Sequence, residues 1–191
     1  MLRPDRRIFF LLSCICLLLL PHSVFATPDV SWQSMDGLVV GVSEGDRLTI
    51  NSFGTEIRVK LYGMIAPQAP KIDKTTGWYK PGQPYAEEAF RALSSKVLHQ
   101  QVRVEIRRTL INKDEQIALA VVYVDGRNIN MEMIAEGWAW VDRKFMTRMD
   151  YAHYMAAERL ARARKDGLWV QEHPQPPWEF KPEFRIRNRH G

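Results

Sequence analysis

The chain has 191 residues, with 27 Lys and Arg against 22 Asp and Glu and a formal net charge of +5 at pH 7. This length is enough for one ordinary domain and leaves little room for a second. With 46% hydrophobic and 10% aromatic residues, the chain can build a packed core, which excludes a wholly disordered or fibrous protein.

The first 26 residues match the pattern of a secretory signal peptide. Three arginines form a basic start, residues 8–20 are apolar, and residues 24–26 resemble the motif that signal peptidase cleaves. We therefore expect cleavage after Ala26 and export, to a periplasm or to the medium. The apolar run is shorter than the ~20 residues that cross a membrane, so a retained transmembrane anchor is the weaker alternative.

Cleavage at this point changes the composition of the mature protein. Both cysteines, Cys14 and Cys16, lie in the signal segment, so we expect no disulfide, thiolate nucleophile or cysteine-based zinc site in the mature chain. No stable membrane anchor is expected after cleavage. The segment also carries three Arg and one Asp, so its removal lowers the formal charge from +5 to +3.

Hydrophobic periodicity predicts the elements of the remaining chain, because alternation favours strands and a spacing of three and four residues favours helices. In chain order we expect strands at 38–42, 48–50 and 56–62, an irregular connection over 64–85, a helix over 85–99, strands at 102–106 and 117–124 joined by a turn over 112–116, and helices over 129–136 and 149–165. The last two helices are expected to end at Gly137 and Gly167, since glycine suits a left-handed cap.

This order of elements fits a five-stranded OB-fold barrel with three helices, an α+β fold that is mainly β. We place a lead-in segment at 27–35, the barrel domain at 36–180 and a basic tail at 181–191, with the tail loose beyond residue 184.

Seven short motifs occur in one order along this domain. They are residues 44–46, 59–67, 83–85, 122–130, 136–141, 167–169 and 176–179. On these motifs the chain resembles the staphylococcal nuclease-like, or thermonuclease, family. The resemblance implies an OB-fold and metal-dependent hydrolysis of phosphodiesters in DNA and RNA, normally with calcium. That chemistry needs carboxylates that hold the cation, a carboxylate that activates water, and guanidinium groups that stabilise the phosphoryl charge.

Part of this machinery is retained. The resemblance aligns Asp46 with the family's first metal carboxylate, and Glu44 stands where a second acidic residue often supports it. Lys60 replaces an arginine of the third strand. Lysine keeps the positive charge but loses the fork that grips two phosphate oxygens.

The rest of the machinery is replaced. The position of the second metal carboxylate holds Ile65, and the position of the water-activating glutamate holds Gln68. Counting back from the turn at 125–126 places Ile117 at the second family arginine. Isoleucine cannot coordinate a cation, and an amide does not take a proton at neutral pH. Neither a metal ion nor another cofactor is therefore expected, and enzymatic activity is the less favoured outcome.

Two functions follow from this pattern. The first is an exported nuclease-like domain that has lost catalysis and binds nucleic acid, another phosphate-bearing ligand or a protein. The alternative is a secreted calcium-dependent phosphodiesterase or endonuclease with a weakened or relocated site at Asp46 and Glu44. Asp114 and Glu115 complete such a site only if their turn folds over the barrel mouth, and a solvated turn is the simpler interpretation.

The long connection holds the remaining candidate ligand-binding residues. Lys71, Lys74 and Lys80 alternate there with aromatic residues, and Tyr85 follows at the start of the predicted helix. Basic and aromatic side chains in alternation are typical of grooves that bind single strands. Solvated lysines and a tyrosine that packs on the helix explain the same pattern, and both interpretations stay open.

Overall fold

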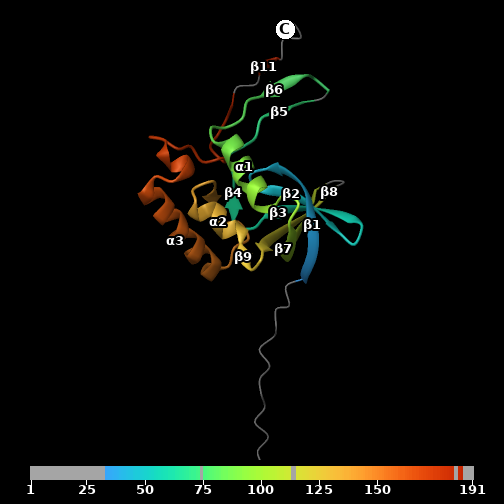
Figure 1. Ribbon diagram of the computed structural model, residues 1–191. Helices are drawn as coiled ribbons and strands as arrows, with labels where there is room; N and C mark the ends of the chain where they lie inside the picture. Colours follow the sequence, from blue (N-terminus) through green and yellow to red (C-terminus); the bar gives the residue numbers. More distant parts are fainter. Residues whose placement is uncertain (1–32, 74, 113–114, 183–184, 187–191) are drawn as a thin grey trace, which may run out of the picture. The chain divides into compact units, whose positions relative to one another are not determined.

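The computed structural model describes residues 33–73, 75–112, 115–182 and 185–186. Five strands form a barrel: β1 (Gln33–Glu44), β2 (Arg47–Ser52), β3 (Thr55–Leu61), β7 (Gln101–Asn112) and β8 (Glu115–Val124). They pair in the order β3-β2-β1-β7-β8, and a parallel pairing of β3 with β8 closes the barrel (Figure 1). The predicted five-stranded barrel with three helices is confirmed, and the parallel pairing makes its sheet mixed. Buried apolar side chains of all five strands fill its interior, including Val39, Ile50, Val59, Val104 and Val122.

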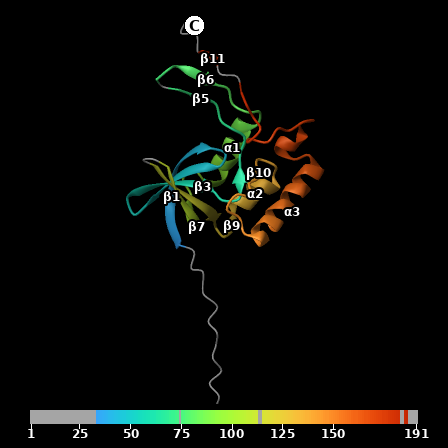
Figure 2. The same cartoon turned by 180° about the vertical axis from the view of Figure 1, so that it is seen from behind.

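Three helices cover part of this core (Figure 2). They are α1 (Ala86–Val97), α2 (Ile129–Ala135) and α3 (Arg148–Arg164). Two side-chain oxygens cap helices, since Asn128 accepts from the backbone N–H of Met131 and Thr147 from that of Asp150. The apolar face of α1 enters the core through Leu93 and Val97, as the periodicity predicted.

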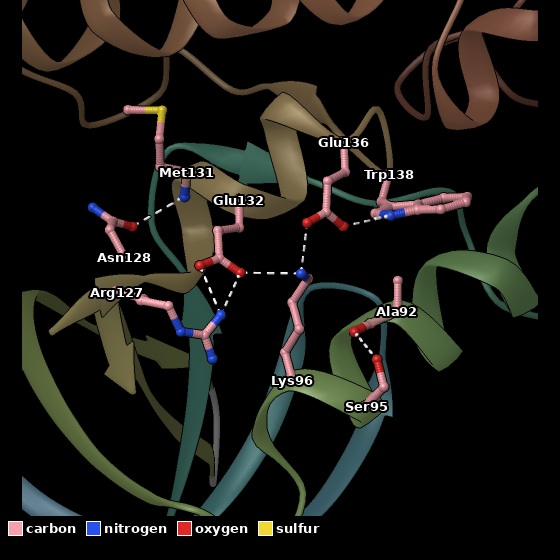
Figure 3. Close-up of polar contacts among 9 residues, drawn as sticks. All are labelled: Ala92, Ser95, Lys96, Arg127, Asn128, Met131, Glu132, Glu136 and Trp138. Atoms are coloured by element: carbon pink, nitrogen blue, oxygen red, sulfur yellow. Dashed lines mark hydrogen bonds and ion pairs between the residues drawn. The ribbon is translucent and has the colours of Figure 1, made fainter. Parts of the chain in front are cut away.

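Ion pairs join α1 to α2. The Nζ atom of Lys96 lies 3.0 Å from Glu132 and 2.7 Å from Glu136, while Arg127 donates to both carboxylate oxygens of Glu132 (Figure 3). Although burial opposes it, hydrogen bonds and charges from Lys96 and Arg127 lower the pKa of Glu132. The same carboxylates raise the pKa of Lys96 against the effect of its burial. The cluster thus holds α1 and α2 together.

The connection over 64–85 is more ordered than predicted. It contains β4 (Met64–Ile65), β5 (Lys71–Ile72) and β6 (Trp78–Lys80). β4 pairs with β10 (Trp140–Val141), and β5 pairs with β6. These strands are too short for a periodic signal. The pairing of β4 with β10 depends on a partner that is distant in the sequence, whereas β5 and β6 form a local antiparallel pair.

Other boundaries also differ from the prediction. Residues 33–35 of the predicted lead-in lie in β1, and β7 and β8 extend into the predicted turn over 112–116. Lys165 in the left-handed conformation, not Gly167, ends α3, and Gly167 begins a short 3-10 helix (Gly167–Val170). Two residues of the predicted loose tail form β11 (Arg185–Ile186), which pairs with β6. The remaining strand, β9 (Arg127–Asn128), pairs with β8.

The predicted signal peptide, its cleavage site, both cysteines and Lys74 lie outside the described residues. Within the described ranges, none of the helices is both long and apolar enough to cross a membrane.

Candidate functional site

Asp46 lies in the tight turn between β1 and β2, at the mouth of the barrel. Its side chain is only 4% exposed, and its carbonyl accepts a hydrogen bond from Leu61 at the end of β3. Gly45 lets this turn lie against α1, because a Cβ atom there would stand 2.7 Å from that of Ala89. The carboxylate is therefore held rigidly at one place in the barrel mouth.

Lys60 neutralises this carboxylate. Its Nζ atom lies 3.0 Å from Oδ2 of Asp46, and its own side chain is only 16% exposed. Arg47 stands directly opposite Lys60 in the β2–β3 register and brings its Nε atom within 3.9 Å of the other oxygen of Asp46. The ammonium group of Lys60 thus lies beside the Asp46 oxygen that a metal ligand would need to offer to the cation.

Glu44 has cationic neighbours of its own. Lys71 of β5 places Nζ 3.1 Å from Glu44, and Arg47 lies 3.7 Å away on another side. Among the predicted ligand-binding lysines, Lys71 therefore belongs to this site. Lys80 instead donates to the side chain of Gln68 at 2.8 Å. Tyr85 precedes α1 in a left-handed conformation and packs against the buried cluster that contains Trp140 and Trp169.

The side chains that the resemblance aligns with the second metal carboxylate and the base make structural contacts. Ile65 on β4 pairs with Trp140 of β10 and packs against the cluster of Trp140 and Trp169. Gln68 uses its amide group to donate to the carbonyl of Pro177, at 2.5 Å. Both side chains therefore act in packing or in holding a neighbouring segment.

Ile117 lies near the start of β8, directly beside Arg58 of β3. Arg58 forms an ion pair with Glu115, which is two residues before Ile117 on the same strand. Arg58 thus brings a guanidinium group close to the backbone position where the resemblance implied one. That group is engaged with a carboxylate.

A cavity of about 470 Å³ opens beside Lys60. Three cations, the carboxylate of Asp142, an apolar wall and two exposed aromatic residues line it: Arg47, Lys60, Leu61, Gly63, Met64, Ile65, Leu110, Leu119, Asp142, Lys144, Phe145 and Trp178. Phe145 lies between two cations, with Arg108 at 4.6 Å and Lys144 at 5.0 Å from the ring centroid. The cavity joins positive charge to aromatic surface, a combination that suits a ligand with phosphate and a ring.

A second cavity, of about 290 Å³, brings acidic residues together. Glu44 and Glu115 both line it, together with Arg47, Arg58 and Ile117. The sequence favoured a solvated turn here, whereas Glu115 lines this cavity together with Glu44 and forms an ion pair with Arg58. Asp114 is not among the described residues.

The side chains present do not fit the calcium ion that the resemblance implies. Calcium takes six to eight oxygen ligands and favours several carboxylates. Here Asp46 and Glu44 are each bound by a lysine, and Ile65 supplies no oxygen. Across the described part of the chain, no three acidic, histidine or cysteine side chains converge in a way that would hold a metal.

The sequence did not predict four cationic or aromatic residues of the cavity lining: Arg47, Lys144, Phe145 and Trp178. Arg47 could have been predicted, because the register of the β2–β3 hairpin sets Arg47 opposite Lys60. Lys144, Phe145 and Trp178 come from segments without helix or strand. Periodicity gives such side chains no direction, so only the folded chain places them at the cavity.

Comparison with known proteins supports the family resemblance that the sequence motifs indicated. The sequence profile of the family described as "Staphylococcal nuclease homologue" matches residues 58–171. An uncharacterized endonuclease of Haemophilus influenzae is 31% identical over 153 residues, which cover 78% of this chain and 74% of that protein. Protein ParB of Escherichia coli is 28% identical, with 88% and 90% covered, and a micrococcal nuclease of Shigella flexneri is 27% identical, with 79% and 83% covered. The chain belongs to the staphylococcal nuclease homologue family.

Proposed function

We propose that this protein binds the phosphate backbone of nucleic acid at the 470 Å³ cavity and does not hydrolyse it by the calcium chemistry of its family. The observation that carries the proposal is the ion pair of Lys60 with Asp46 at the barrel mouth. It puts a lysine where the reaction needs a free metal carboxylate. Arg47 and Lys144 add two further cations to the lining. Lysine and arginine contacts to phosphate supply most of the affinity of non-specific nucleic-acid binding.

Several residues support the proposed absence of hydrolysis. The base position carries an amide, and that amide is already bonded to Pro177 and Lys80. The second carboxylate position carries Ile65. Loss of a single transition-state guanidinium costs about 10³- to 10⁵-fold in some phosphoryl transfer reactions, and here the base and one carboxylate are absent as well.

A binding assay tests the first half of the proposal. We would follow the fluorescence anisotropy of a labelled single-stranded oligonucleotide with chelator present, at several salt concentrations. Lys144→Gln should weaken binding several-fold and reduce the salt slope by about one unit, as expected for one phosphate contact. Arg159 lies exposed on α3, so Arg159→Gln removes the same charge elsewhere and should leave the slope nearly unchanged. Equal effects of both variants would contradict binding at this cavity.

The alternative function is a phosphodiesterase or endonuclease with a relocated site. Two observations support it. Glu44 and Glu115 line one cavity. Two of the similar proteins are named as an endonuclease and a nuclease. The comparisons favour this function over the first, whereas the ion pairs of the barrel mouth favour the first. The alternative requires Lys60, Lys71 and Arg58 to leave their carboxylates when a cation binds.

A nuclease assay separates the two functions. Purified residues 27–191 would be incubated with DNA in calcium, in magnesium and in chelator, beside Asp46→Ala and Glu115→Gln variants checked for folding by circular dichroism. The first proposal expects no degradation and no rise of Tm in millimolar calcium. Chelator-sensitive activity that folded variants lose would establish the alternative, and calcium would then raise Tm by mass action.

We also propose that the protein acts after export. The sequence of residues 1–26 supports this. Amino-terminal sequencing of protein expressed in a bacterium should find Thr27 as the first residue, and a periplasmic or secreted fraction should contain it. Full-length protein retained in the cytoplasm would contradict export.

A further inference from the structure

The segment that follows the 3-10 helix is strapped onto the loop at the barrel mouth. Two glutamine side chains hold it: Gln68 donates to the carbonyl of Pro177 at 2.5 Å, and Gln83 donates to the carbonyl of Gln175. A turn within the segment adds hydrogen bonds from Glu179 to Pro176 at 3.0 Å and from Gln175 to Glu179 at 3.1 Å. We call residues 174–179 the strap. Its three prolines further limit its backbone freedom.

Gln68 and Gln83 also bind each other. The backbone N–H of Gln68 donates to the side chain of Gln83 at 3.2 Å, and the backbone N–H of Gln83 donates to the carbonyl of Gln68 at 2.8 Å. Gln83 is only 6% exposed, so its amide group is built into the fold. We call the side chains of Gln68 and Gln83 the clamp. Because these two residues also bind each other, the clamp has a fixed base, and it contacts the strap through specific hydrogen bonds.

The amide of Gln68 is essential to this clamp. A glutamate at the same position, as the family resemblance implies, has no N–H that could donate to Pro177 at neutral pH. A carboxylate would instead face a carbonyl oxygen. The exchange of a catalytic glutamate for glutamine thus provides the donor on which the strap depends.

The strap carries Trp178 to the cavity. Its indole lines the cavity together with Phe145 and Lys60, yet 58% of its surface stays exposed. Burial of apolar area therefore does not account for the way the strap is held. A rigid, exposed tryptophan beside cations is the usual form of a stacking platform for the bases of a single strand.

We propose that Trp178 stacks on a base of the nucleic-acid strand whose phosphates bind Arg47, Lys60 and Lys144, and that Gln68 and Gln83 are the positioning residues that hold it there. This inference rests on the proposed function. It assigns the cavity a substrate class, single-stranded nucleic acid with accessible bases. The cavity volume of about 470 Å³ lies within the usual range of small-ligand sites.

The test compares two labelled probes of equal length and charge: a thymidine oligonucleotide and an oligonucleotide of abasic sites. The measured quantity is the ratio of the abasic Kd to the thymidine Kd, which cancels the phosphate contribution. Trp178→Ala should lower this ratio by about 5-fold to 150-fold, the range of one lost base stack, while Trp178→Phe should keep most of it. Phe53 is a fully exposed aromatic residue at the β2–β3 turn, and Phe53→Ala should leave the ratio unchanged.

The clamp is tested by Gln68→Met, which removes the amide at nearly constant length. It should lower the same ratio and speed amide hydrogen exchange at residues 175, 178 and 179. Gln100→Met at an exposed position is the matched control. A wild-type protein that binds the thymidine probe, with a Trp178→Ala variant of unchanged ratio, overturns the inference and leaves the proposed function intact. Failure of the wild-type protein to bind either probe overturns both.

Discussion

The ion pair at the barrel mouth makes one stability prediction that can be worked from the structure. Lys60→Met removes the ammonium but keeps the length of the side chain. The side chain of Asp46, which is only 4% exposed, then has Arg47 at 3.9 Å as its remaining cation. Removing one partner of a buried pair costs about 3–5 kcal/mol because the other charge stays buried. Partial exposure of Lys60 and the nearby arginine reduce this, so we expect a loss of about 2–3 kcal/mol.

Urea unfolding at neutral pH, followed by circular dichroism, measures this loss directly. For a chain of this size the same change should lower Tm by about 4–12 °C. Lys71→Met is the matched control, because its pair with Glu44 is 60% exposed on the lysine side and should contribute at most about 1 kcal/mol. The double variant Lys60→Met with Asp46→Leu removes both charges and should regain most of the stability.

Equal losses in Lys60→Met and Lys71→Met would refute the reasoning. They would show that the carboxylate of Asp46 is solvated in solution and available to other cations. A double variant no more stable than Lys60→Met alone would instead show that the lysine acts through packing of its chain.

Three further predictions concern the scaffold of the site. Asn130 is fully buried and makes hydrogen bonds to Val122, Tyr62 and Ala120, so Asn130→Ala should cost about 3 kcal/mol in urea unfolding, against about 1 kcal/mol for loss of the helix cap in Asn128→Ala. Gly137→Ala should lower Tm by several degrees, because a Cβ atom would lie 2.2 Å from the carbonyl oxygen of Asp166. The folded protein lowers the pKa of Glu132, so its contribution is present above about pH 4.3 and is lost as the pH falls through the folded-state pKa. Glu132→Gln should therefore flatten the acid side of the stability curve, and a curve parallel to that of the wild type would contradict this linkage.

Much of the barrel could be predicted from the chain alone. The alternation of apolar residues in β2 and β3 and the three-and-four spacing of α1 are local signals, and each matches one face of the core. The short strands β4, β5 and β10 could not be found this way. Two or three residues carry no period, and the pairing of β4 with β10 joins residues that are far apart in the sequence, such as Ile65 and Trp140.

The candidate site divides in the same manner. From the identities of Ile65, Gln68 and Ile117, the family resemblance implies that a metal ligand, the base and one arginine are replaced, and this alignment stays a prediction. Only the tertiary structure decided what the replacements and their neighbours do: Lys60 neutralises Asp46, Gln68 clamps the strap, and Trp178 faces the cavity. These contacts join residues up to 109 positions apart, and their geometry comes from strand register, the barrel closure and the packing of segments that have no period to read.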